Sequence, residues 1–233
     1  MDQGALQKIL DNSVLQNFEA GRIVVQQGDM PANIYFILEG SVRTLRANVE
    51  GDEATIRMLK PGDTCMEAVL FMGIPSPIVV QAVDDAKMIM INGNFIKKFI
   101  KENNQLASNL LEIVTHYYKA AMHQIEGMAI KSPLQRVGYY FLQKHIEQGS
   151  NNTEFELPFK KSIIANHLGI TPETFSRTLT QIKKMGIEVE GRHIHMKDIF
   201  ALCQFCDIDA AHQCTALNKK DCVHCPMHTE NCN

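Results

Sequence analysis

Evenly spaced glycines constrain the fold of the first part of this chain most strongly. Gly28, Gly40, Gly51 and Gly62 stand 12, 11 and 11 residues apart, and short runs of branched and aromatic residues lie between them. Glycine adopts the positive φ that tight turns require, so each of these glycines marks a turn. Short strands at even spacing favour an antiparallel barrel or roll over a βαβ fold. The sequence therefore predicts an antiparallel β-barrel or roll over residues 20–91.

The period of the pattern becomes helical from about residue 94, and more than 30 residues follow without proline. One seam of this helix has a 4-3-4-3-4 spacing: Leu110, Val114, Tyr117, Ala121, Gln124 and Met128. A long helix with a narrow seam usually packs on a partner, and a second copy in a two-fold dimer is the natural one. The alternative is a helix that packs only on its own roll. Ser132 and Pro133 end the pattern and mark a hinge.

Two helices and a hairpin are predicted after this hinge. The stretch "KKSIIANHL" indicates a short helix, and "GI" indicates a tight turn. In the second helix Thr171 can cap the N-terminus, Pro172 fits the first helical position and Gly186 suits the end. The stretch "IEVEGRHIHM" then indicates a hairpin with a turn at Glu190 and Gly191. Helix–turn–helix followed by a hairpin is the outline of a winged DNA-binding domain.

Polar side chains gather at the start of the second helix. Glu173, Ser176 and Arg177 lie at i, i+3 and i+4, with Thr174 beside them. Arg177 can bind O6 and N7 of a guanine, and Glu173 can accept a hydrogen bond from a cytosine amino group. Over residues 159–198, seven lysines and arginines outnumber four acidic residues, although the whole chain has a net charge of −3. The local excess suits phosphate contacts, with Lys160 and Arg192 as candidates; alternatively, these charges are solvated surface groups.

Six of the seven cysteines lie in the last 31 residues. Cys203-x2-Cys206 and Cys222-x2-Cys225 are separated by fifteen residues, a spacing that predicts a tetrathiolate metal site. Cys214 and Cys232 are additional candidate ligands. Thiolates suit zinc and iron–sulfur clusters alike, so the sequence leaves a structural knob and a sensor open. A tail that binds no metal and is sometimes oxidised is the third reading.

Several classes of protein do not fit the sequence. The N-terminus lacks the basic and apolar regions of a signal peptide, and no apolar run reaches the roughly 18–20 residues needed to span a bilayer. These features predict a cytoplasmic protein with no membrane partner, in which thiols stay reduced. No glycine-rich nucleotide loop, nucleophile elbow or carboxylate pair indicates an enzyme. A redox-active oxidoreductase site at the cysteines is the enzymatic alternative.

The order of a glycine-punctuated roll, a long seam helix and a winged helix–turn–helix resembles the CRP/FNR family of bacterial transcription regulators. The stretches "GDMPANIYFILEGSVR" and "LKPGDTCMEAVLFMG" look like the effector-domain signature of that family, and "ETFSR" looks like the E-x-x-S-R signature of its FNR-like branch. The resemblance covers about residues 20–200 and implies an α+β fold. We expect an effector β-roll over 1–105 of the cyclic-nucleotide-binding type, a dimerisation helix over 106–131 and a winged helix–turn–helix over 132–200. The cysteine-rich tail over 201–233 is an addition to the family pattern.

The resemblance also implies partners and site residues. Glu173, Ser176 and Arg177 would read a TTGA…TCAA-type palindrome as part of a homodimer, and RNA polymerase would be a further partner. Glu67 would belong to the effector pocket. Members that bind cyclic AMP carry an arginine after this glutamate, whereas the stretch "IPSPIVVQAV" has none. A buried phosphate without a cation is costly, so we do not expect cyclic AMP to bind.

The stretch "MEAVLFMGIPSP" is more similar to the nitrate-respiration regulators, a branch associated with nitric oxide and haem. His116, His123 and His145 are candidate axial ligands for a haem, although each also fits a surface or interface position. We therefore expect a regulator that senses redox state, oxygen or nitric oxide, with an iron–sulfur cluster on the cysteines favoured over zinc. The alternative is a ligand-sensing regulator of the same fold whose zinc-bound tail is purely structural.

Overall fold

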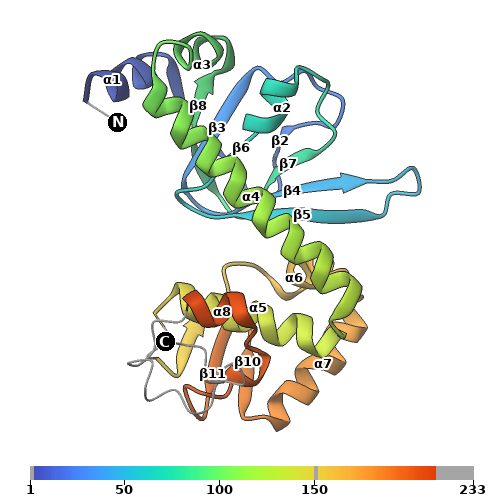
Figure 1. Ribbon diagram of the computed structural model, residues 1–233. Coiled ribbons are helices and arrows are strands. Elements are labelled where there is room, and N and C mark those ends of the chain that lie inside the picture. The colour runs from blue at the N-terminus through green and yellow to red at the C-terminus, as the bar shows by residue number, and fades with distance from the viewer. Residues whose placement is uncertain (1–2, 150–151, 214–233) are drawn as a thin grey trace. The chain divides into compact units, whose positions relative to one another are not determined.

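The computed structural model describes residues 3–149 and 152–213 (Figure 1). Contacts divide the chain into two compact units, Met1–His123 and Gln124–Asn233. The long helix α4 (Asn104–Ile130) contributes residues to both units. Each unit is described separately.

The first unit contains two antiparallel four-stranded sheets. Their strand orders are β1-β8-β3-β6 and β2-β7-β4-β5. This arrangement confirms the predicted antiparallel roll. The strands are β1 (Ser13–Phe18), β2 (Ile23–Val25), β3 (Asn33–Glu39), β4 (Val42–Ala47), β5 (Glu53–Leu59), β6 (Thr64–Cys65), β7 (Val79–Ala82) and β8 (Ala86–Asn92).

The four evenly spaced glycines all have positive φ, as the turn prediction requires: Gly28, Gly40, Gly51 and Gly62. Gly40 is constrained by space as well, because a Cβ there would overlap the carbonyl oxygen of Asp85. These turns fix the lengths of the strands, and the inward residues of the two sheets then form one core. Its fully buried members include Ile37, Val42, Val80 and Met88.

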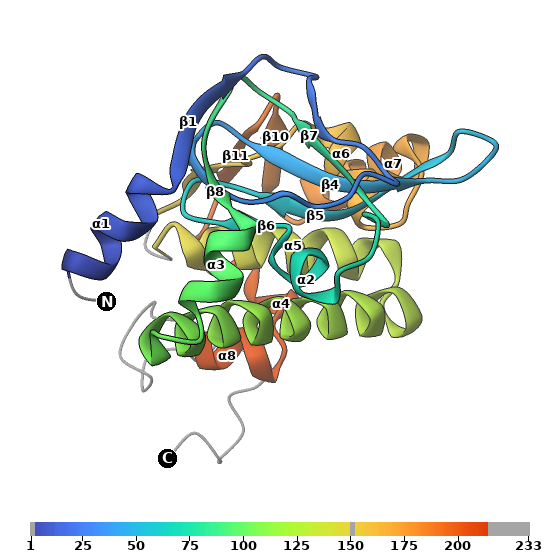
Figure 2. The same ribbon diagram turned by 90° about the horizontal axis from the view of Figure 1, so that it is seen from above.

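A second cluster joins the helices of the first unit to the roll. It includes Ile9 of α1 (Gln3–Asp11), Leu70 of α2 (Glu67–Met72), Phe99 of α3 (Gly93–Phe99) and Leu110 of α4. Figure 2 shows α2, α3 and the first part of α4 on the same side of the roll. One side of α4 is therefore covered by its own chain.

The second unit is the predicted helix–turn–helix with a hairpin. Its elements are α5 (Pro133–Glu147), β9 (Glu154–Glu156), α6 (Lys161–His167), α7 (Pro172–Lys184), β10 (Ile187–Glu190) and β11 (His193–Met196). The hairpin strands pair with β9 in the order β10-β11-β9. Ser132 caps α5 in a capping box with Gln135, so the chain changes direction between α4 and α5.

The chain continues past the wing as a packed segment. A 3₁₀ turn, η1 (Cys203–Phe205), and a short helix, α8 (Ile208–Gln213), follow β11. Leu202 and Ala210 are buried, so this segment belongs to the core of the second unit. The predicted tail residues beyond 213 lie outside the described residues.

Candidate nucleic-acid interface and effector sites

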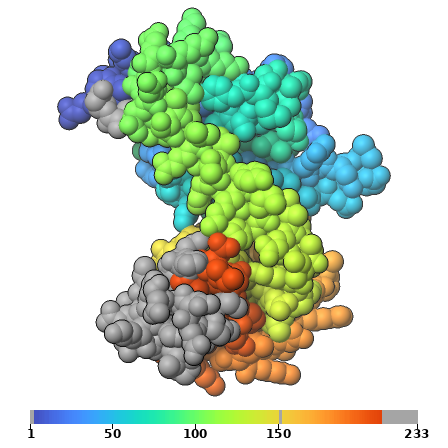
Figure 3. Space-filling model, in the orientation of Figure 1, coloured from blue at the N-terminus to red at the C-terminus, as the bar shows by residue number. Residues whose placement is uncertain are grey.

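Helix α7 presents the predicted reading residues on its exposed side. Phe175 and Ile182 are buried, and the Thr171 hydroxyl caps the helix by accepting the Thr174 N–H at 3.2 Å. This packing leaves Glu173, Ser176 and Arg177 exposed, while Thr174 is half-buried. Figure 3 shows the α6 and α7 residues, in orange, at the surface of the second unit. The three side chains are therefore free to approach a base edge from the start of α7.

The surroundings of Glu173 favour its ionised carboxylate form. Hydrogen bonds from its own backbone N–H and from Thr171 lower the pKa of its carboxyl, and Arg177 lowers it further. The carboxylate is fully exposed, so it is available as an acceptor. An ionised carboxylate accepts hydrogen bonds and donates none, which fits a cytosine amino group.

An open groove lies between the wing and the N-terminal end of α6. Lys160 and Arg192 line this groove together with Lys161 and Glu156. Lys160 is exposed. The Nε of Arg192 donates to the Leu157 carbonyl at 3.0 Å and lies 3.3 Å from a Glu156 carboxylate oxygen. Both predicted phosphate contacts thus face the same groove, but Arg192 is partly engaged within the protein.

The turn between α6 and α7 is tied to the end of α4. Arg136 donates from Nη1 to the Leu168 carbonyl at 2.9 Å and from Nε to the Lys131 carbonyl at 3.0 Å. Gln124 of α4 donates to the His167 carbonyl at 3.0 Å. These bonds hold the turn that orients α7, and sequence reasoning did not single out Arg136 or Gln124 for this role.

Glu67, the predicted effector residue, is the first residue of α2 and is only 2% exposed. One carboxylate oxygen lies 3.5 Å from Nη1 of Arg57, and the other is buried without a hydrogen-bond partner among the described residues. A buried carboxylate is unfavourable unless charge and hydrogen bonds compensate it. Met66, directly before it, has a φ of 73° and is the only non-glycine residue with positive φ in the described part of the chain.

Arg57 connects Glu67 to α4. Its guanidinium carbon lies 3.3 Å from the ring centroid of Tyr117, and Nη2 donates to the Thr64 carbonyl at 2.8 Å. The Tyr117 hydroxyl also donates to the Thr64 carbonyl at 3.1 Å and accepts the Thr64 N–H at 3.2 Å. The roll therefore has a cation beside Glu67 that comes from β5, ahead of the arginine-free stretch.

The predicted dimer seam of α4 divides between two sides of the helix. Leu110 is buried against the roll and Tyr117 contacts Arg57. Val114, Ala121 and Met128 are exposed. They belong to an exposed and mainly apolar stripe with 3-4-3-4-3 spacing, the α4 stripe: Leu111, Val114, Tyr118, Ala121, Ile125 and Met128. The stripe keeps half of the predicted seam and shifts the other half by one residue, because the roll covers the side that bears Leu110.

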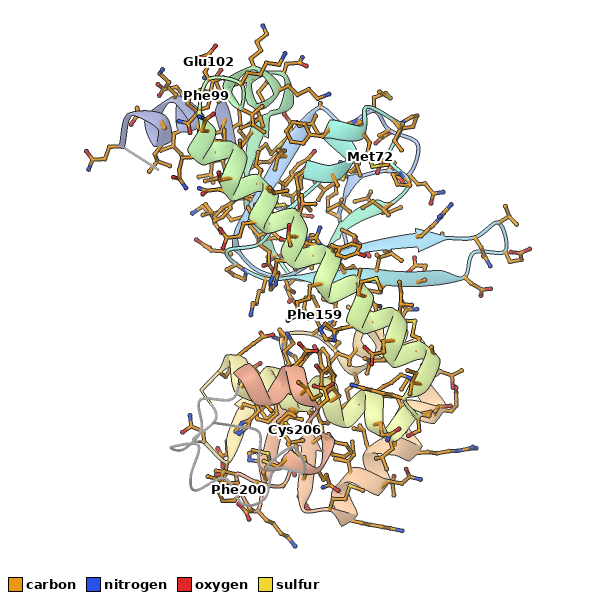
Figure 4. All side chains as sticks on the ribbon, viewed as in Figure 1. Met72, Phe99, Glu102, Phe159, Phe200 and Cys206 are labelled. Atoms are coloured by element: carbon orange, nitrogen blue, oxygen red, sulfur yellow. The ribbon has the colours of Figure 1, made fainter. Side chains whose placement is uncertain are left out.

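Two of the predicted metal ligands lie in the described residues. Cys203 and Cys206 are half-buried at the ends of η1, and the Cys206 N–H donates to the Cys203 carbonyl at 2.9 Å. Figure 4 shows Cys206 beside α8. Two thiols on one tight turn are a donor set that suits zinc and iron–sulfur clusters. The other candidate ligands lie outside the described residues: Cys214, Cys222, Cys225 and Cys232.

The three candidate haem histidines lie in separate places. His116 is exposed on α4, and His123 is half-buried on the same helix. His145 is 3% exposed in the second unit, with its ring centroid 5.4 Å from that of Phe155. His145 therefore belongs to the packed core around α5.

Residues 15–103 match the cyclic nucleotide-binding domain family, and residues 135–205 match the Crp-like helix-turn-helix domain family. The chain belongs to the CRP/FNR family of transcription regulators. It is therefore a DNA-binding regulator of transcription and not an enzyme. No helix in the described part of the chain is long and apolar enough to cross a membrane.

The relatives of this regulator align with most of its length. An anaerobic regulatory protein of Pasteurella multocida is 25% identical over 84% of this chain and 73% of its own length. The fumarate and nitrate reduction regulatory protein of Escherichia coli is 24% identical over 84% and 80%. Among solved structures, FixK2 from Bradyrhizobium japonicum matches with a TM-score of 0.74 at 19% identity, covering 84% of this chain and 98% of its own. A CooA variant from Carboxydothermus hydrogenoformans matches with a TM-score of 0.74 at 23% identity, covering 85% and 89%. The two structures share the fold described above.

Proposed function

We propose that this regulator reads a TTGA…TCAA-type palindrome through Glu173, Ser176 and Arg177. The observation that carries this proposal is their shared exposed position at the start of α7, whose other side is buried. Arg177 offers two N–H donors to a guanine, and the ionised Glu173 accepts from a cytosine amino group. Lys160, with Arg192 beside it, supplies phosphate contacts that fix the register.

The proposed assembly is a homodimer formed through the α4 stripe. A palindrome presents two equivalent half-sites, and a two-fold dimer places one reading helix in each. The stripe offers large exposed apolar side chains at the spacing of a helix pair, including Leu111, 68% exposed, and Ile125, 61% exposed. Contact with RNA polymerase belongs to the same proposal.

The proposed signal is redox state, oxygen or nitric oxide, received by a metal centre on the C-terminal cysteines. Cys203 and Cys206 support it because they already share one turn at the packed end of the second unit. The names of the relatives agree with respiratory control, since they include an anaerobic regulatory protein. An iron–sulfur cluster is favoured over zinc, and haem is a separate candidate.

A second candidate function is ligand sensing in the roll, with the tail as a structural zinc site. One carboxylate oxygen of Glu67 has no hydrogen-bond partner within residues 3–149 and 152–213, and this favours it, because a buried acceptor is satisfied by a hydroxyl or amino donor from a ligand. Cyclic AMP does not fit this proposal, since Arg57 is paired with Glu67 and stacked on Tyr117. Thermal melts with and without cyclic AMP test this point, and a rise in melting temperature would contradict it.

Substitution Arg177→Ala tests the reading proposal. We expect it to weaken binding to the palindrome by about tenfold or more and to leave binding to a scrambled site unchanged, because one bidentate base contact is lost in each half-site. Fluorescence anisotropy with both DNA duplexes measures this. Lys183→Ala, at the other end of α7, is the matched control and should weaken both equally if it has any effect. Equal affinity of the intact, metal-loaded regulator for both duplexes would contradict the proposal.

An anaerobic absorption spectrum with elemental analysis tests the signal. Iron and sulfide with a brown chromophore indicate a cluster, a sharp Soret band indicates haem, and zinc without colour indicates a structural tail. We expect iron and sulfide, and we expect Cys203→Ser with Cys206→Ser to lose them. A metal content that the double variant leaves unchanged would contradict ligation by these two thiols.

A further inference from the structure

The segment that carries Cys203 and Cys206 is anchored to α5. The ring of Phe205 lies against Gly138 so closely that a Cβ on Gly138 would overlap it. Leu202 before the turn and Ala210 after it are both buried. The cysteine turn is therefore held on a helix of the DNA-binding unit from both sides.

Asp207 joins the same segment to the end of α4. Its Oδ2 accepts from Lys131 Nζ at 2.8 Å, and Lys131 is the residue directly after α4. The ammonium of Lys131 also lies 3.5 Å from the ring centroid of Tyr139, and Asp207 Oδ1 accepts the Ala210 N–H at 3.0 Å. The Lys131 and Asp207 side chains are 22% and 31% exposed, so solvent screens this pair less than a fully exposed one.

The cysteines and this ion pair are adjacent in the chain. Cys206 precedes Asp207 directly, and its Sγ donates to the Asp207 carbonyl at 3.4 Å. A metal held by Cys203 and Cys206 restricts the peptide that positions the Asp207 carboxylate. We propose that Phe205, Asp207, Lys131 and Gly138 form a hinge clasp that transmits metal occupancy of the two thiols to the α4–α5 junction.

Lys131 gives this clasp a route to the DNA-reading helix. Its side chain binds Asp207, and its carbonyl accepts from Arg136 at 3.0 Å. Arg136 also donates to the Leu168 carbonyl in the turn before α7. Metal binding at the thiols thus stabilises one arrangement of α4, α5 and that turn. The inference rests on the proposed metal centre and adds the path by which it acts.

The test compares hydrogen exchange in chelator-stripped and Zn²⁺-loaded full-length protein under anaerobic conditions. In the wild type we expect Zn²⁺ to slow exchange of residues 131–139 by about tenfold, because it holds a charge-assisted hydrogen bond closed. Asp207→Asn keeps the acceptor for Ala210 but removes the charge. It should bind the same amount of Zn²⁺ and show less than about a twofold change.

Two further variants keep the result decisive. Lys131→Gln removes the same pair from the other side and should behave like Asp207→Asn. Glu147→Gln removes the Lys144–Glu147 pair of α5, 2.7 Å long and apart from the junction, and should respond like the wild type. A Zn²⁺-loaded wild type without slower exchange at 131–139, or a full response in both junction variants, overturns the clasp. A full-length protein that retains neither iron nor Zn²⁺, as seen by elemental analysis, overturns the proposed metal centre and the clasp with it.

Discussion

The cysteines that the structure describes occupy two different chemical environments. Cys65 on β6 is fully buried; burial, with Glu67 nearby, raises the pKa of its thiol to about 12. Cys203, the first residue of η1, and Cys206, directly after it, are half-buried. Since the thiolate is the form that binds metals and reacts with electrophiles, thiol chemistry in the described residues concentrates at η1.

We predict that iodoacetamide at pH 8 modifies Cys203 and Cys206 in the chelator-stripped native protein and spares Cys65. A thiol with a pKa of about 12 is ionised to roughly one part in ten thousand at pH 8, and its raised pKa keeps it protonated at any lower pH. Peptide mapping by mass spectrometry measures the modified fraction. In urea Cys65 should react like the others, which is the control. Native Cys65 that reacts as fast as Cys203 would contradict the prediction.

The shared exposed position of the candidate reading residues was predictable from sequence, whereas the contacts around Glu67 were not. Glu173, Ser176 and Arg177 share a helix, so their spacing alone places them on one side. Arg57 acquires its role from Tyr117, 60 residues away in sequence, and no local pattern predicts such a contact. Long-range packing therefore determines the contacts of Glu67.

At the scale of elements, the junction of α5 and η1 depends on the absence of one side chain. Gly138 faces the Phe205 ring and leaves no room for a Cβ. A Cβ on Gly127 of α4, by contrast, would meet nothing within 4 Å. Alanine substitutions at these two helical glycines therefore separate the effect of packing from the effect of backbone entropy on stability.

Gly138→Ala should lower the free energy of unfolding by about 1–3 kcal/mol, because overpacking displaces Phe205 and η1. Gly127→Ala should raise it by about 0.5–1 kcal/mol, because alanine reduces the entropy lost by a helical residue. Urea unfolding monitored by circular dichroism measures both. A Gly138→Ala variant as stable as the wild type would show that Phe205 does not hold the segment in place.

The bounds of the helices were easier to predict from the sequence than the packing of those helices on other elements. Thr171, Pro172 and Gly186 correctly predicted the start and end of α7, since capping depends on neighbouring residues. Which side of α4 is exposed could not be predicted in the same way. Leu110 and Leu111 both fit a heptad, and only the packing of the roll on one side decides which remains exposed. Similarly, nothing local indicated that residues 202–210 pack onto α5.

At the scale of the whole molecule, α4 contributes residues to both units, and side chains in each unit contact it. Arg57 stacks on Tyr117 within the first unit, while Gln124 and Arg136 tie the end of α4 to the turn before α7 in the second. The ion-pair partner of Glu67 and the turn before α7 are therefore each in contact with a residue of α4.

Ile125→Glu tests the dimer at this scale. If two copies pack through the α4 stripe, the substitution places a carboxylate from each copy in an apolar contact. The dissociation constant of the dimer should then rise by about a hundredfold. Sedimentation velocity measures the monomer–dimer equilibrium, and anisotropy should show a parallel loss of affinity for the palindrome. Ala120→Glu adds the same charge to an exposed position outside the stripe and should remain dimeric. A dimeric Ile125→Glu variant with wild-type DNA affinity would contradict the stripe as the interface, because a dimer cannot bury two unpaired carboxylates there without a large loss of stability.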